Sequence, residues 1–419
     1  MQNDPELDAF DKLRIREIGA KYDQTPFAFL AQFQSIAANL EPDERIKLVM
    51  TYPYDDVELM KAVLSDPQAN KICSLQWEYN REEDVNSIIP LLINNCPELA
   101  SLRVDFYDHF VLDFLSSVLE HPCTKVKVLE MPPYTKGDLA RFFAALEQSR
   151  VSAIALTSGA FPEGLYEYLT KDLLVRLEVM MDRDEVPSEL MMSLANCTCL
   201  SELRLVECAF PEPTASALPN SITKLVFSYC AFVHDFDWSF LTDSNVRELH
   251  FNSMEDVDGN QLGDALAVCL RAKGLDKLRL YRCDFADETL AVVGIELGRI
   301  KRLDFGGRLN DASIKLIALA LLSPNSEVEE LVLEYAHSTM SGIEDHLVPA
   351  LKHPNCNLSE LSLWTSQAEH REAALKVESK FHNRLALFVL LQGQQIRRLR
   401  SPLKRLPVDL FRLVGQVLI

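Results

Sequence analysis

Three closely spaced cysteines raise the question of metal binding. Cys197, Cys199 and Cys208 fall within the stretch NCTCLSELRLVECAF, residues 196–210. Structural zinc takes four ligands, commonly from paired C-x2-C motifs. Here the C-x-C pair has no partner pair, and Cys208 would be only a third ligand. Zinc is therefore the weaker interpretation, and we expect neither a metal nor another cofactor.

A repeating frame accounts for these cysteines better. Counted from Leu200, leucines stand at positions four and six, Cys208 at position nine and a phenylalanine at position eleven; the frame recurs from Ile222 and from Leu275. Six of the ten cysteines occupy two positions of the frame: Cys96, Cys123 and Cys197 three residues before a start, and Cys208, Cys230 and Cys283 eight after one. Small, weakly polar residues at fixed repeat positions are typically buried, so we predict a structural role.

A looser L-x-x-L-x-L core extends the repeat in both directions. It starts at Ile72, Leu99, Val126, Val151, Leu174, Leu200, Ile222, Val246, Leu275, Ile300, Val328 and Leu358, in steps of 22 to 30 residues. The pattern L-x-x-L-x-L-x-x-(N/C)-x-L resembles that of leucine-rich repeat proteins over about residues 70–370, most closely the ribonuclease-inhibitor-like subclass. The resemblance implies a curved solenoid whose concave face recognises other proteins.

The residues themselves predict the same α/β architecture. Leucines at positions four and six alternate inward on a short strand, and successive strands stack into a parallel sheet. A polar atom at position nine can bond buried backbone groups of the neighbouring coil. Apolar residues at helical spacing predict returning helices over 84–96, 109–123, 138–150, 261–274, 312–326 and 343–356. Between Pro211 and Ser244 prolines and short returns predict little regular helix.

The segments outside the repeats predict three divisions of the chain. Residues 1–68 read as an N-terminal helical cap, with Thr25 as a helix N-cap and Pro26 in the first turn. Residues 69–367 hold about twelve repeats. Residues 368–419 form a C-terminal helical cap or a basic appended module. A solenoid needs polar-faced ends such as these to stay in solution.

Composition limits the classes of partner and compartment. The chain has 42 Lys and Arg against 62 Asp and Glu, a formal charge of −20, which disfavours nucleic acid. It has no run of about 18 apolar residues that predicts a membrane span, and no Sec-type leader at its start. We therefore expect a cytoplasmic monomer with reduced thiols that binds neither nucleic acid nor membrane, or a secreted effector acting in a host cytoplasm. The sequons at Asn196 and Asn357 have no role there.

The strand positions that face away from the core are the candidate protein-binding residues. Positions five, seven and eight bring Arg, Tyr and Trp, which dominate interface energetics, to the C-terminal repeats. The predicted concave-face site is His250, Arg279, Tyr281, Arg282, Glu334, Tyr335 and Trp364. The alternative is that these side chains only pack across strands. An enzyme remains a further alternative, although the sequence has no metalloprotease, hydrolase, P-loop or dinucleotide-binding motif.

The end of the chain offers a second kind of partner. In SPLKRLPVDLFRLVGQVLI, Leu406 and Pro407 are followed by Leu410 and Leu413 at helical spacing, which resembles the opening of an F-box. That resemblance implies an adaptor contact and a substrate receptor of a ubiquitin ligase, a role that also occurs among bacterial effectors. An F-box usually precedes the repeats and is longer than the fourteen or so residues available here. An ordinary amphipathic cap is the simpler interpretation.

Overall fold

The computed structural model describes most of the chain as two units. Unit 1 comprises residues 1–208 and 218–222, and unit 2 comprises residues 209–217 and 223–419. The described residues are 13–19, 25–51, 57–79, 85–106, 111–131, 138–157, 165–169, 173–210, 218–233, 236–254, 257–307, 309–335, 342–353, 355–365, 371 and 374–382.

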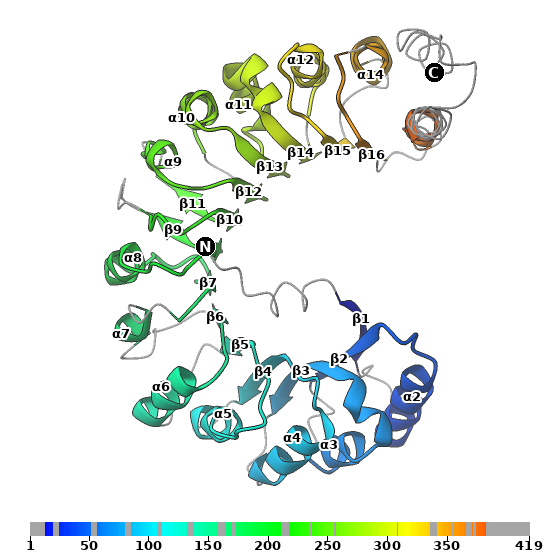
Figure 1. Cartoon of the computed structure of the whole chain (residues 1–419), viewed down its shortest axis with the longest axis vertical. Helices are drawn as coiled ribbons and strands as arrows, with labels where there is room; N and C mark the ends of the chain where they lie inside the picture. Colours follow the sequence, from blue (N-terminus) through cyan, green and yellow to red (C-terminus); the bar gives the residue numbers. More distant parts are fainter. Residues whose placement is uncertain are drawn as a thin grey trace, which may run out of the picture. The chain divides into compact units, whose positions relative to one another are not determined.

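Unit 1 contains a parallel sheet whose strands follow one another in chain order (Figure 1). The described strands are β1 (Arg14–Gly19), β2 (Glu44–Met50), β3 (Ile72–Tyr79), β4 (Ser101–Phe106), β5 (Val128–Met131), β6 (Ala153–Thr157), β7 (Arg176–Met180) and β8 (Glu202–Val206). The register pairs equivalent repeat positions, for example Leu177 with Leu203 and Val179 with Leu205. These pairs of leucines and valines are buried, because successive coils stack the same positions.

Strands β1 and β2 correct the prediction that residues 1–68 form a purely helical cap. Glu44–Met50 alternates buried and half-buried side chains, the period of a strand with one face on the core. Counted back from Leu48 in the sequence, the first position of the frame falls on Arg45, but a register shift pairs the buried Ile46 with Ile72, the first position of the next repeat. The helical part of the prediction is confirmed: the Thr25 hydroxyl accepts a hydrogen bond from the Ala28 N–H at the start of α2.

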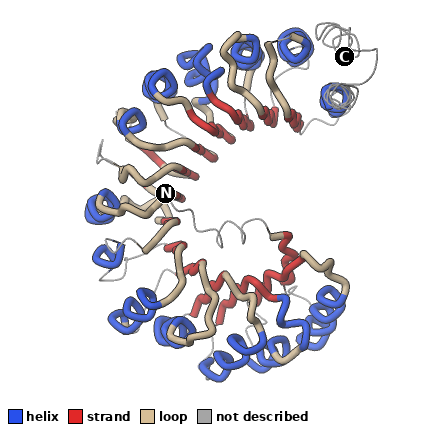
Figure 2. The backbone as a smooth tube through the Cα atoms, viewed as in Figure 1, coloured by secondary structure: helices blue, strands red, loops and turns tan. Residues whose placement is uncertain are grey.

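Helices cover one face of the sheet in each unit (Figure 2). In unit 1 they are α2 (Pro26–Ala38), α3 (Val57–Leu64), η1 (Pro67–Lys71), η2 (Val85–Ile88), α4 (Ile89–Asn95), α5 (Val111–Leu119), α6 (Leu139–Gln148), α7 (Leu165–Leu169) and α8 (Ser188–Ala195). The side chains of α5 on the sheet side, such as Phe114 and Leu115, are fully buried. We call the opposite face of each sheet, which no described helix covers, its open face.

Unit 2 repeats the plan of a parallel sheet with helices on one face. Its parallel sheet runs through β10 (Lys224–Ser228), β12 (Glu248–Asn252), β13 (Leu275–Tyr281), β14 (Ile300–Gly307), β15 (Glu330–Tyr335) and β16 (Glu360–Thr365). The covering helices are α9 (Phe240–Asp243), α10 (Gly259–Ala272), α11 (Ala286–Val293), η3 (Gly294–Arg299), α12 (Asp311–Leu322), η4 (Ile343–Leu347), α14 (Val348–Lys352) and residues 374–382. The predicted α/β repeat fold with a parallel sheet is confirmed.

An aromatic cluster replaces the helical layer where the returns are short. Over the described part of 211–244 the only helix is α9, and β9 (Ala209–Phe210) pairs instead with β11 (Ala231–Phe232). Phe232 stacks on Phe210 with ring centroids 4.7 Å apart and lies 4.9 Å from Trp238. Aromatic rings carry large apolar area, so they fill the volume that helices fill elsewhere. The expectation of little helix here is met in the described residues.

All twelve repeat starts are buried, and each lies at or just before one of the strands β3 to β8, β10 and β12 to β16. This agreement follows from the physics of the motif. The first, fourth and sixth positions point into the core, and a polar residue at any of them would lose its hydration without gaining a partner. At the far end, helix 374–382 covers β16: Glu378 accepts a hydrogen bond from the Leu363 N–H, and His382 Nε2 lies 3.1 Å from the Leu361 carbonyl.

Candidate protein-binding surface

The cysteines at position nine hold neighbouring coils together. The Cys208 thiol donates to the carbonyl oxygens of Val206 (3.3 Å) and of Val179 (3.6 Å) in the preceding coil. The Cys283 thiol makes the equivalent contacts to Tyr281 and Phe251, each at 3.5 Å. Burial raises the pKa of Cys283 to about 12, so its thiol stays protonated at neutral pH. The predicted turn role of this position is confirmed.

The second cysteine position is less uniform than predicted. Cys96 and Cys197 are buried, and burial raises the pKa of Cys96 to about 12. Cys123 is exposed, because it lies in the turn after α5, where its N–H donates to His121 Nδ1. Among the described residues no three His, Cys, Asp or Glu side chains are grouped as metal ligands.

In several repeats the residue at position eight turns the chain with a left-handed backbone after the strand. Glu207, Tyr229, Ser253 and Arg282 have φ between 50° and 54°, which costs about 1 kcal/mol for a residue with a Cβ. The N–H groups of Tyr229, Ser253 and Arg282 donate to the position-seven carbonyl of the next strand, at 2.7 to 2.9 Å. These bonds hold the turn and aim the position-eight side chain out of the coil.

The open face of unit 1 carries charges that neutralise one another. The Glu202 side chain, 9% exposed, accepts hydrogen bonds from Arg176 at 2.8 Å and from Arg204 at 2.6 Å. Arg103 likewise donates to Glu130 at 3.3 Å. Burial is the main cause that raises the pKa of Glu178, which lies 3.8 Å from Arg204. The arginine donors of this face are therefore largely occupied by its own carboxylates.

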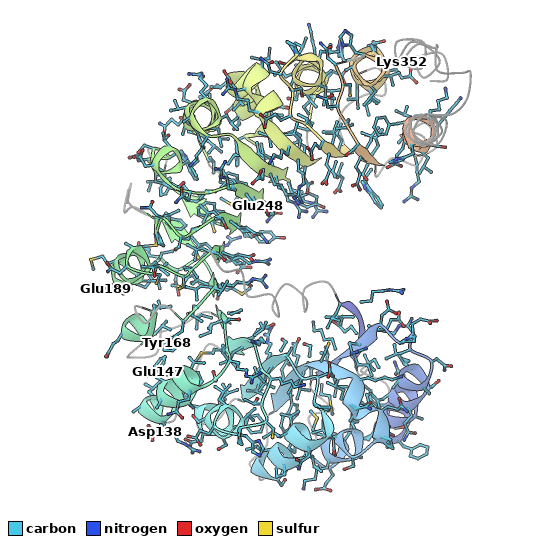
Figure 3. The ribbon with its side chains drawn as sticks, viewed as in Figure 1. Asp138, Glu147, Tyr168, Glu189, Glu248 and Lys352 are labelled. Atoms are coloured by element: carbon cyan, nitrogen blue, oxygen red, sulfur yellow. The ribbon has the colours of Figure 1, made fainter. Side chains whose placement is uncertain are left out.

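The open face of unit 2 gathers Arg and Tyr on β13. Side chains 277, 279 and 281 share this face, while Leu278 and Leu280 are buried on the other. The Arg279 guanidinium lies 4.9 Å from the centre of the Tyr281 ring, and the Arg282 guanidinium lies 5.2 Å from it. Both distances fit cation–π contacts. In Figure 3, Glu248 extends from β12 on the open side, whereas Lys352 extends from the outer helix α14.

The remaining predicted residues lie along the same rows of the sheet. The register sets Glu334 beside Trp364, whose side chain is 63% exposed. His250 pairs with Arg279 across β12 and β13 but is 9% exposed, so it offers little area to a partner. Tyr335 ends β15, and its side chain lies outside the described residues. Tyr229, at position eight before β11, is 54% exposed.

Comparisons with known proteins agree with the repeat. No protein-family model matches the chain. Over 207 residues, 38% of its length, it is 24% identical to the cattle (Bos taurus) protein "NACHT, LRR and PYD domains-containing protein 9", and the match spans 20% of that relative. The relative's name includes leucine-rich repeats, and in the described residues of this chain twelve parallel strands begin at or just after buried repeat starts. The chain is a leucine-rich repeat protein.

A solved internalin from Listeria monocytogenes is also similar to this leucine-rich repeat protein. It has 13% sequence identity and a TM-score of 0.40, and the alignment covers 84% of this chain and 88% of the internalin. No helix of the described residues is both long and apolar enough to span a membrane. The F-box-like residues Leu406, Pro407, Leu410 and Leu413 lie outside the described residues.

The site expected from the sequence omits Lys277, Asp304 and Gly306, although Asp304 and Gly306 stand at positions five and seven, which were expected to face a partner. Lys277 stands at position three, which alternates onto the same face as positions five and seven but was not counted as a surface position. Its Nζ lies 3.8 Å from Asp304 Oδ2, and Arg279 Nε lies 3.5 Å from the same oxygen. Gly306 lies under the Tyr281 ring, so a Cβ built there would approach Tyr281 Cε2 to 2.7 Å. Strand alternation already indicated that Lys277 lies on this face. The role of Asp304 as shared counter-ion and that of Gly306 as the space for the Tyr281 ring became visible only from the register between strands.

Proposed function

We propose that this leucine-rich repeat protein is a non-catalytic recognition module, and that the open face of unit 2 binds a partner protein. The observation that carries the proposal is the exposure of Trp364 and Tyr229 on strands or turns whose core positions are already filled. Large aromatic side chains that a fold leaves in water are typical of interface anchors. Tyr281 and the arginines beside it supply the other residue types enriched at interfaces.

The chemistry of the thiols supports recognition over catalysis. A nucleophilic cysteine needs a lowered pKa and access to substrate. Burial instead raises the pKa of Cys73 to about 11 and that of Cys283 to about 12. Both thiols bond to backbone carbonyls of a neighbouring coil, which is a structural use.

Co-purification with matched variants tests the proposal. Tyr281→Ala with Trp364→Ala removes two aromatic side chains from the open face, and Ile295→Ala with Leu319→Ala removes two exposed apolar side chains from the helical face of the same unit. Tagged full-length chains would be recovered from extracts of cells that make the protein, after circular dichroism has shown equal folding. We expect the partner to be lost with the first pair and kept with the second. Retention with the first pair, or loss with the second alone, contradicts the proposal.

A further inference from the structure

We propose that Lys277, Arg279 and Arg282, here named the β13 cation cluster, form a carboxylate-binding site that recognises an acidic segment of a partner protein. The inference rests on the proposed function and adds the chemistry of the partner. Two of these cations share one carboxylate, and two share one aromatic ring. The three side chains are thus linked through Asp304 and Tyr281 on the open face.

The donors of the cluster are not used up within the protein. Asp304 is the shared counter-ion, yet its Oδ2 lies 3.5 Å from Arg279 and 3.8 Å from Lys277, beyond a normal charge-assisted hydrogen bond. Arg279 Nε is buried and has no hydrogen-bond partner among the described residues. One carboxylate at these distances leaves the Lys277 ammonium and the outer guanidinium nitrogens of Arg279 able to bind a ligand, whereas a ligand cannot reach the buried Nε.

Unit 1 contains a comparable group of charges in which the carboxylate does occupy the donors of its cations. Glu202 also lies between two cations, but it accepts from Arg176 and Arg204 at 2.8 and 2.6 Å. In each unit, the carboxylate and its cations lie on the open face of that unit's own sheet. The short contacts at Glu202 close the first site, whereas the long contacts at Asp304 leave the second site open to a further carboxylate.

Tyr281 and Gly306 prepare the site sterically. The absence of a side chain at Gly306 lets the Tyr281 ring lie against β14, where a Cβ would be in collision with it. Arg279 and Arg282 each lie over this ring, which limits the rotamers they adopt before a ligand arrives. Pre-ordered guanidinium groups lose less entropy on binding a carboxylate.

Charge favours an acidic protein segment over nucleic acid. The chain as a whole carries a formal charge of −20, so a polyanion as long as nucleic acid would be repelled over most of its length. A short acidic segment meets the three cations of the cluster, with Asp304 between two of them and Glu248 beside Lys277 in the register. Trp364 and Tyr229, exposed on neighbouring strands and turns of the unit, would contact apolar residues flanking the acidic ones.

Binding of defined probes to the full-length chain tests the site. The probes are a fluorescein-labelled dodecapeptide of alternating Glu and Gly, its Gln counterpart, and a twelve-nucleotide thymidine strand, each followed by fluorescence anisotropy at low salt. We expect the Glu peptide to bind and the Gln peptide to bind at least about tenfold more weakly, since charge-assisted hydrogen bonds are lost. Equal binding of the two peptides, or tighter binding of the thymidine strand, overturns the proposal.

Three variants assign that binding to the cluster. Arg282→Gly removes a cation at a φ of 53°, where glycine is unstrained, and Arg279→Gln removes another. Each variant is expected to bind the Glu peptide about tenfold more weakly than the wild type does. Arg271→Gln, on the outer face of α10, removes the same charge away from the site and should change nothing. If Arg271→Gln lowers the affinity for the Glu peptide as much as Arg279→Gln does, then the net charge of the chain explains the effect. That result would overturn the proposal.

Asp304→Asn is expected to change the affinity for the Glu peptide in the opposite direction. Because Asp304 competes with a ligand carboxylate for Lys277 and Arg279, its neutralisation is expected to tighten binding of the Glu peptide several-fold. Unchanged or weaker binding, in a variant that circular dichroism shows to be folded, overturns the proposal. If the natural partner is lost with Tyr281→Ala and Trp364→Ala but kept with Arg279→Gln and Arg282→Gly, the recognition function stands and the carboxylate site fails.

Discussion

The Cys283 thiol yields a quantitative test of the stacked-coil structure. Burial raises its pKa from an ordinary 9.0 to about 12, so the folded state holds the proton that the unfolded state releases. A group whose folded pKa is raised contributes stability below its unfolded pKa and loses it as the pH rises towards the folded pKa. The loss therefore falls between about pH 9 and pH 12. At pH 10 it amounts to about 1.4 kcal/mol relative to pH 8, from one pH unit above the unfolded pKa.

Cys283→Ala isolates this contribution because alanine does not titrate. Urea unfolding followed by circular dichroism, at pH 8 and at pH 10, gives the free energy of unfolding of both proteins. The wild type is expected to lose about 1.4 kcal/mol more than the variant between the two pH values. Parallel losses would refute the buried position of this thiol. A smaller loss in the wild type would indicate a stabilised thiolate, as metal binding requires.

Three further changes probe packing and the open faces. Phe232→Ala should lower the free energy of unfolding by about 3–5 kcal/mol, with Phe232→Leu costing much less, in calorimetry of the full chain; equal small losses would contradict the aromatic cluster. Glu202→Ala should cost about 2 kcal/mol, measured by urea unfolding, because two arginines lose their acceptor; no loss would show that these bonds are formed without net gain. Gly306→Ala should cost about 1–3 kcal/mol in the wild type and much less beside Tyr281→Ala, and an additive double variant would contradict their contact.

The repeat could be predicted because its determinants are local and periodic. Leucines at positions four and six define each strand, and Cys208 or Cys283 at position nine follows from the same count. Strand β2 was not predicted, because Arg45 stands where the frame of the sequence expects leucine. Its buried residues Ile46 and Leu48 nevertheless alternate with half-buried ones, as in a strand with one face on the core. The exposed Cys123 shows that a shared repeat position does not fix burial where the turn differs.

Only part of the candidate binding surface could be predicted from the sequence. Position counting placed Arg279, Tyr281 and Trp364 on the open face, and their exposure or ring contacts follow from strand alternation. The loose sharing of Asp304 and the space above Gly306 depend on which strand lies beside which, and on side-chain distances. Those are properties of the register between coils, which single-strand patterns do not contain.

Site-specific photo-cross-linking can locate the face of unit 2 that a partner protein contacts. Benzoylphenylalanine would replace Trp364 on the open face or Leu319 on α12, both of them exposed positions of unit 2. After irradiation in extracts of cells that make the protein, we expect a covalent adduct with a partner protein from position 364 and none from position 319. Adducts from position 319 alone, or equal adducts from both positions, would contradict recognition through the open face of unit 2.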